Sequence, residues 1–275
     1  MDVVKSGGFI VKFDPEKLRA TLRHIHAKPE TIDHIVQKVS KQAFDGVTTR
    51  ELFSMVRREL IRENHCLAHR YNLRNGLLKL GPAGFKFEKY VASILTAYQY
   101  KAEVPEKEFN GLCVRHEIDV IAEKDDRVAV IEAKFRNRFD DVVTLKDTMA
   151  TWSRFVDLVD GGKAGICPKF DEIWIVTNGK FSDRAHQFGM CKGVHLIGWS
   201  SEENSLARMV DHAALYPITV LDDVRQWELD RFAEKNLMLC REVADKTPAA
   251  IAKLIDVSEE RAEKIIKDAA EVITL

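Results

Sequence analysis

The sequence lacks several features that would assign it to common protein classes. Its five cysteines are widely spaced with no Cys-x-x-Cys pair, which predicts free thiols in a reducing cytoplasm rather than disulfides or structural zinc. No apolar run approaches about 18 residues, and the N-terminus has no uninterrupted apolar core, so neither a membrane span nor a signal peptide is expected. P-loop and Gly-x-Ser-x-Gly motifs are also absent, which argues against P-loop ATPases and common esterases.

A strong net charge is lacking as well, but the formal value of −1 conceals an asymmetry. Residues 1–82 carry 15 Lys and Arg against 9 Asp and Glu, a net charge of +6. Residues 83–221 carry 18 against 21, and residues 222–275 carry 9 against 13. Nucleic-acid binders usually show a basic footprint, and only the N-terminal segment has one. A local groove, or a metal ion that cancels negative charge, would still allow the rest to bind DNA.

The chain is nevertheless long enough to form two to three small domains. Its 275 residues are 45% hydrophobic and 31% charged, as in ordinary globular proteins. Residues 80–84 (Leu-Gly-Pro-Ala-Gly) place two glycines around a proline, which stops a helix and predicts a linker. We therefore expect an N-terminal domain at 1–82, a central domain at 83–221 and a C-terminal domain at 222–275.

Charged residues in two neighbouring apolar runs are the most informative feature. Asp119 lies in the first run, and the second leads directly into Glu132, Ala133 and Lys134. Side chains two apart on a strand share a face, so Glu132 and Lys134 point the same way, and a hairpin would bring Asp119 close to them. Two adjacent carboxylates favour a divalent cation, and a lysine beside it can orient water. This predicts metal-assisted phosphodiester hydrolysis, although a hairpin with a charged, solvated face would show the same spacing.

This Asp…Glu-x-Lys pattern resembles the PD-(D/E)xK nuclease superfamily, and in particular its Mrr-like restriction endonuclease branch. Residues 84–95 resemble the first core helix of that family, and residues 170–178 and 194–199 resemble later core strands. The resemblance covers roughly residues 83–221 and implies an α/β fold, with a restriction-endonuclease-like mixed sheet flanked by helices. Two departures are Ile118 in place of the proline of the superfamily name, and a glutamate where many Mrr relatives carry glutamine.

The resemblance also implies a set of site residues. The implied catalytic residues are Asp119, Glu132, Lys134 and Glu88 of the first core helix. The implied cofactor is Mg²⁺ or Mn²⁺, held by Asp119, Glu132 and the carbonyl of Ala133, with DNA as the substrate.

Residues 1–82 read as a small, mostly helical domain that begins with a β-hairpin. The hairpin turns around Ser6-Gly7-Gly8, and Asp14 before Pro15 predicts an N-cap. Helices are expected at 17–26, 29–44, 49–63 with a cap at Thr49, and 66–78.

This segment resembles the ATP-cone, a nucleotide-sensing module. The resemblance is carried by Val3-Val4-Lys5, by Phe13 to Leu18 and by Gly46 to Leu52. It implies that ATP or dATP is an effector bound by Val3, Lys5, Asp14, Lys17 and Thr49. The family usually has Lys-Arg-Asp-Gly in its hairpin, whereas this chain has Lys5-Ser6-Gly7-Gly8. A relic cone, or an adaptor for protein or DNA, is therefore an open alternative.

Residues 222–275 are predicted to be all-α. Thr247-Pro248 and Ser258-Glu259-Glu260 cap two helices joined by a short turn, which resembles a helix-hairpin-helix module. The joint at 254–257 contains no glycine and the segment is acidic, so a structural or docking role is favoured over DNA contact.

The sequence as a whole predicts a metal-dependent DNA endonuclease with nucleotide regulation through the cone, acting as a homo-oligomer in the cytoplasm. The alternative is a catalytically idle nucleotide-sensing regulator that binds DNA or protein.

Overall fold

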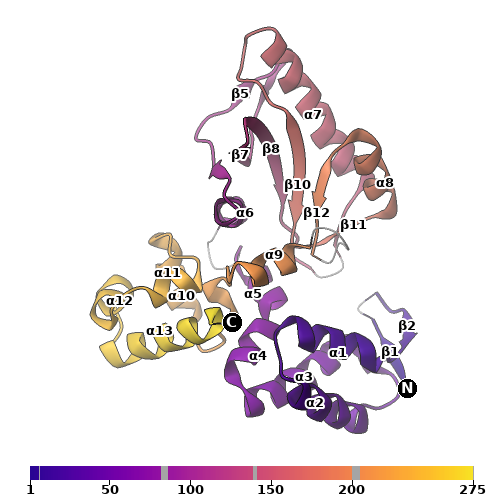
Figure 1. Cartoon of the computed structure of the whole chain (residues 1–275), viewed down its shortest axis with the longest axis vertical. Helices are drawn as coiled ribbons and strands as arrows, with labels where there is room; N and C mark the ends of the chain where they lie inside the picture. The colour runs from indigo at the N-terminus through magenta and orange to yellow at the C-terminus, as the bar shows by residue number, and fades with distance from the viewer. Residues whose placement is uncertain (6, 82–85, 139–140, 200–204, 275) are drawn as a thin grey trace. The chain divides into compact units, whose positions relative to one another are not determined.

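The chain forms two compact units in a computed structural model that describes residues 1–5, 7–81, 86–138, 141–199 and 205–274. Met1–Leu77 and Tyr216–Leu275 together make the first unit, and Leu78–Leu215 make the second (Figure 1). Three sequence predictions fall partly outside the described residues: the linker at 82–84, Phe85 of the first core helix, and Ser6 of the hairpin turn.

A five-stranded mixed sheet with the order β12-β10-β8-β7-β4 is the centre of the second unit. Its strands are β4 (Lys101–Glu103), β7 (Val120–Lys124), β8 (Arg127–Lys134), β10 (Glu172–Thr177) and β12 (His195–Ile197). The strand β7 is antiparallel to both of its neighbours, β4 and β8, whereas β8, β10 and β12 are parallel. The predicted α/β architecture with a mixed sheet is therefore confirmed.

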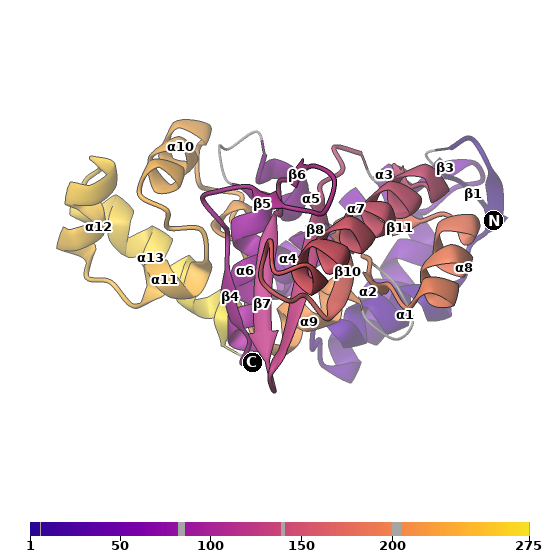
Figure 2. The ribbon, with the colours of Figure 1, turned by 90° about the horizontal axis from the view of Figure 1, so that it is seen from above.

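Helices cover both faces of this sheet. Ile173 and Ile175 of β10 share a buried core with Leu158 of α7 (Leu145–Lys163). On the other face, residues from α6 (Phe87–Ala97), α9 (Leu206–His212), β10 and β12 line one small common cavity: Val91, Ile94, Leu95, Val176, Ile197, Leu206 and Met209. Figures 1 and 2 show α6 and α7 on opposite sides of the strands. Every second residue of β8, counted from Val130, therefore faces α7.

The hairpin of β7 and β8 fixes which side chains meet at the end of the sheet. The register pairs Val120 with Ile131 and Lys124 with Arg127, which leaves a two-residue turn. Both turn residues, Asp125 and Asp126, have positive φ (50° and 59°), as a type I′ turn requires. A slip of one residue would turn every side chain to the opposite face, so this turn specifies the geometry of the site.

Several elements of the second unit differ from the sequence prediction. The strand β7 begins at Val120, so Asp119 precedes the strand instead of lying within it. The edge strand β4 was not predicted because it is short and polar. The helix α9 was missed although Leu206, Met209 and Val210 have helical spacing. Short pairs β5 (Phe109–Asn110) with β6 (Arg115–His116), and β9 (Val142–Val143) with β11 (Lys180–Phe181), were also missed. The helix α8 (Asp183–Lys192) begins after Ser182, whose side chain accepts the N–H of Ala185.

The first unit starts with a three-stranded sheet and helices. The strands β1 (Asp2–Val4), β2 (Ile10–Lys12) and β3 (Val47–Thr48) have the order β2-β1-β3. The helices are α1 (Pro15–His24), α2 (Pro29–Gln42), α3 (Thr49–Glu63), α4 (His65–Tyr71) and α5 (Leu73–Lys79). Asp14 caps α1 as predicted, because its Oδ1 accepts the N–H of Glu16 at 3.0 Å. The predicted cap of α3 at Thr49 is wrong, since Thr48 forms a capping box with Glu51.

The single helix predicted for residues 66–78 is interrupted at Asn72. Its side-chain amide donates to the carbonyl of Val220 at 3.2 Å and to Asp222 Oδ1 at 3.0 Å, which fixes a chain bend between α4 and α5. Gly76 of α5 lies so close to Val220 that a Cβ atom there would be 2.6 Å from Val220 Cγ1. These contacts are long range, so local sequence does not reveal the bend.

The C-terminal segment is helical, as predicted, and completes the first unit. It contains a 3₁₀ turn, η1 (Ile218–Val220), and the helices α10 (Gln226–Glu234), α11 (Cys240–Ala244), α12 (Pro248–Ile255) and α13 (Glu259–Ile273). Asp256 ends α12 in the left-handed conformation, with φ 56°. Arg70 of α4 donates through Nε to the carbonyl of Val272 at 3.0 Å, which connects α13 to α4. No helix within the described ranges is long and apolar enough to cross a membrane.

Candidate active site

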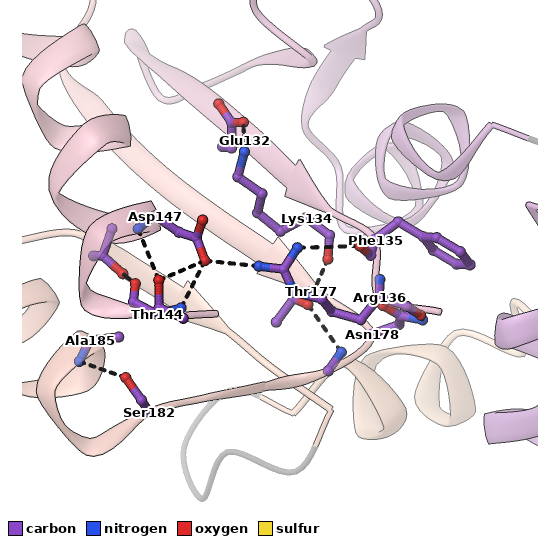
Figure 3. Close-up of polar contacts among 12 residues, drawn as sticks. Glu132, Lys134, Phe135, Arg136, Thr144, Asp147, Thr177, Asn178, Ser182 and Ala185 are labelled. Atoms are coloured by element: carbon purple, nitrogen blue, oxygen red, sulfur yellow. Dashed lines mark hydrogen bonds and ion pairs between the residues drawn. The ribbon is translucent and has the colours of Figure 1, made fainter. Parts of the chain in front are cut away.

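Glu132 is a nearly buried carboxylate near the end of β8, with 7% of its surface exposed. Lys134 Nζ donates to Glu132 Oε1, and Arg154 Nη1 of α7 donates to Glu132 Oε2. Figure 3 shows the Lys134 side chain extending back along the strand to Glu132. Burial of an unpaired carboxylate costs several kcal/mol, so the two cations make the charge tolerable. The predicted shared face of Glu132 and Lys134 is present.

Asp119 lies beside this carboxylate. The register of β7 and β8 continues to put Asp119 opposite Glu132, and the N–H of Ala133 donates to Asp119 Oδ2 at 2.7 Å. Burial raises the pKa of Asp119 to about 6, and the charge of Glu132 adds to the shift, against the opposing effects of the Ala133 N–H and Lys134. The N–H and C=O of one strand residue point to the same side, so the Ala133 carbonyl also faces the Asp119 side.

Glu88 approaches the same site from the first turn of α6. Its negative charge makes a further, smaller contribution to the raised pKa of Asp119. Its carboxylate lies 3.9 Å from Lys86 Nζ. Among the residues with described positions, no three His, Cys, Asp or Glu side chains gather closely enough to hold a metal ion together. Glu88 is therefore near Asp119 without completing a three-carboxylate cluster.

The oxygen groups around Asp119 and Glu132 fit a magnesium-type cation. Two carboxylates and one backbone carbonyl are hard donors, whereas zinc and copper sites usually contain histidine or cysteine. Mg²⁺ commonly binds one or two carboxylates and retains several waters, so a third acidic side chain is not required.

Hydrogen bonds hold the end of β8 in place. Thr177 Oγ1 donates to the carbonyl of Lys134 at 2.6 Å. Asn178 accepts the N–H of Arg136 at 2.7 Å and donates to its carbonyl at 2.9 Å. Arg136 also pairs with Asp147 at 2.9 Å in the first turn of α7, as Figure 3 shows. Arg136 therefore stabilises the strand end.

Arg154 is the site residue that sequence reasoning missed. It belongs to no motif and lies 22 residues after Glu132. A signal was nevertheless present, because Arg154 follows the buried Thr151 by three residues and precedes the buried Leu158 by four. Residues at this spacing share one helix face, so the position faces the sheet.

The residues predicted to bind nucleotide surround the small sheet of the first unit. Val3 is buried in β1, whereas Lys5, Asp14, Lys17 and Thr49 are exposed. Thr49 Oγ1 donates to the carbonyl of Val4 at 3.3 Å, which places it beside Lys5. Asp14 and Lys17 begin α1 beyond the other end of β1, on the order of 10 Å away along the strand.

Comparison with known families gives three matches along the chain. The model described as "ATP cone domain" matches residues 1–75, and "Restriction endonuclease" matches residues 82–209. The model described as "AF1548-like, C-terminal" matches residues 216–273.

Two relatives extend across these boundaries. A protein of Archaeoglobus fulgidus, described only as uncharacterized, is 35% identical over 164 residues, which is 59% of this chain and 88% of the relative. The crystal structure of a protein of unknown function, AF1548, superimposes with a TM-score of 0.56 at 33% identity. That match covers 68% of this chain and 97% of the solved one.

Proposed function

Because the chain belongs to the Mrr-like restriction endonuclease family and carries an N-terminal ATP-cone domain, we propose that it is a metal-dependent DNA endonuclease. In this proposal it hydrolyses phosphodiester bonds with Mg²⁺ or Mn²⁺, and ATP or dATP at the cone regulates the reaction. Asp119, Glu132 and the Ala133 carbonyl would hold the cation, with Glu88 assisting.

The proposal depends mainly on the convergence of Asp119, Glu132 and Lys134 at one end of the sheet. Lys134 and Arg154 compensate the charge of Glu132. The half-buried Asp119 beside it has a raised pKa, so its negative charge is unfavourable for stability without a further cation. Buried carboxylates with a raised pKa are common at functional sites. A structural hairpin would keep its stability better with apolar residues at these positions.

The side chains have separable roles in such a reaction. A bound divalent cation would supply Lewis-acid stabilisation of the phosphate and lower the pKa of a bound water. Lys134 lies within reach of Glu132 and carries hydrogens to orient the attacking water or contact the phosphate. The Ala133 N–H fixes the orientation of Asp119, so the two carboxylates stay in register.

A nicking assay tests this function directly. Purified full-length protein is incubated with supercoiled plasmid and Mg²⁺ or Mn²⁺, alongside Lys134→Ala and a control, Lys101→Ala, on the exposed edge strand β4. We expect Lys134→Ala to lose about 100-fold or more of the rate while remaining folded, with a lower melting temperature because Glu132 loses one of its two cations. Plasmid cleavage by Lys134→Ala at the wild-type rate would refute the assignment.

Nucleotide regulation has an independent test. Calorimetry with ATP and dATP should show binding that Lys17→Ala weakens and that Lys41→Ala, an exposed charge on α2, leaves unchanged. Size-exclusion chromatography with and without nucleotide tests the expected homo-oligomer. Absence of binding to wild-type protein would limit the cone to an adaptor role.

One observation favours a second function. Both oxygens of Glu132 are already paired with cations of the protein, as expected of a catalytically idle regulator that binds DNA or protein. Nucleotide binding without any metal-dependent nicking would select this alternative.

A further inference from the structure

The ion pairs of Glu132 conflict with its proposed role as a metal ligand. Each of its oxygens accepts from a different cation, Lys134 on one side and Arg154 on the other. A divalent ion bound to Glu132 would lie within a few ångströms of both positive groups, where like charges repel strongly in a partly dry site. Metal binding therefore requires at least one of the two cations to leave.

Arg154 is better placed to leave than Lys134. Its side chain is 34% exposed, whereas that of Lys134 is 27% exposed, so the guanidinium can turn outward. A guanidinium is planar and can donate two parallel hydrogen bonds to two oxygens of one phosphate. Arg154 also comes from α7 and not from β8, so its movement does not disturb the strand that holds Glu132 and Lys134.

We propose that Arg154 excludes the metal ion from Glu132 until a DNA phosphate takes over its guanidinium. DNA and the divalent cation then bind cooperatively, and metal without DNA binds weakly. This inference rests on the proposed nuclease function and makes Arg154 a residue that contacts the DNA backbone. Coupling is reciprocal, so DNA must raise metal affinity by the same factor by which metal raises DNA affinity.

The first test measures Mn²⁺ affinity without DNA, by calorimetry on the full chain. Arg154→Gln should bind Mn²⁺ about fivefold or more tightly than wild type, within the usual range of such couplings. Lys163→Gln is the matched control, since it removes one charge from the same helix at an exposed position paired with Asp160. The control should stay within about twofold of wild type. Equal or weaker Mn²⁺ binding by Arg154→Gln would overturn the inference.

The second test repeats the titration with a phosphorothioate duplex that resists cleavage. The duplex should raise the Mn²⁺ affinity of wild type and of Lys163→Gln, but not that of Arg154→Gln. Arg154→Lys keeps the charge without the planar fork, so it should retain weak Mn²⁺ binding and show reduced coupling. The same increase with DNA in Arg154→Gln as in wild type would also reject the proposal.

These outcomes are distinct from failure of the proposed function. Nicking that depends on Lys134, together with unchanged Mn²⁺ binding in Arg154→Gln, keeps the nuclease assignment and rejects only the role of Arg154. Absence of Mn²⁺ binding in every variant, with and without DNA, rejects both.

Discussion

Replacement of Asp119 by asparagine should stabilise the second unit in metal-free solution at neutral pH. Asparagine keeps an oxygen that can accept the N–H of Ala133, which is the hydrogen bond that Asp119 makes at 2.7 Å. It removes the negative charge that burial and the neighbouring Glu132 disfavour. A substitution in the candidate active site would therefore make the protein more stable while removing a proposed metal ligand.

The magnitude follows from the pKa of Asp119. A rise from 3.8 to about 6 corresponds to about 3 kcal/mol at about 1.36 kcal/mol per pKa unit. Asp119 is only half-buried, so solvent screens part of this energy, and we expect on the order of 2 kcal/mol.

The direction of the pH dependence of stability is set by whether the folded or the unfolded state binds the Asp119 proton more tightly. The folded state holds it up to about pH 6, whereas the unfolded state releases it near pH 4. The contribution of Asp119 to stability therefore falls as the pH rises through this window. The advantage of Asp119→Asn should be near zero below the window, should grow through it, and should be constant above it.

Denaturant titration with fluorescence detection provides the measurement. Trp152, Trp174 and Trp199 lie in the second unit and Trp227 in the first, so a Trp227→Phe background reports on the second unit alone. Both proteins carry that change and are unfolded in EDTA across the pH range. An Asp119→Asn variant no more stable than wild type at about pH 8 would show that Asp119 is not destabilised by its surroundings.

Three further predictions concern the scaffold. Gly76→Ala should destabilise the first unit by about 1–3 kcal/mol, because the new Cβ would lie 2.6 Å from Val220 Cγ1. Thermal denaturation followed by Trp227 fluorescence measures this loss, and an unchanged melting temperature would show that the contact relaxes freely. Thr48→Ala removes the capping box with Glu51 and should cost about 1 kcal/mol, measured by circular dichroism. The Asp157 carboxylate accepts the N–H groups of Cys113 and Val114 in the turn between β5 and β6, and Asp157→Asn should weaken these hydrogen bonds. Amide hydrogen exchange in this turn should then be faster at neutral pH, and unchanged protection would contradict this reasoning.

The hairpin of β7 and β8 was predictable because its signals are local. The apolar run of β8 gives the strand, and the period of two gives the shared face of Glu132 and Lys134. The start of β7 was predicted too early because the apolar Ile118 extends the pattern beyond the paired residues. The cap of α1 was also a local signal, so the start of that helix was predicted within a residue or two.

Contacts between distant segments could not be predicted in this way. Arg154 joins the site across 22 residues, and a single sequence does not show which arginine meets which carboxylate. The bend at Asn72 depends on acceptors about 150 residues away, so the apolar pattern alone indicated one continuous helix. The union of both chain ends in one compact unit was missed for the same reason.

That union has a consequence for biosynthesis. During translation, Met1–Leu77 leave the ribosome before Leu78–Leu215, and their packing partner, Tyr216–Leu275, leaves it after both. Leu78–Leu215 are contiguous, so the second unit can fold before the residues that complete the first unit have been made. Chains that terminate within the second unit would therefore contain an incomplete first unit, a state that chaperones and proteases recognise.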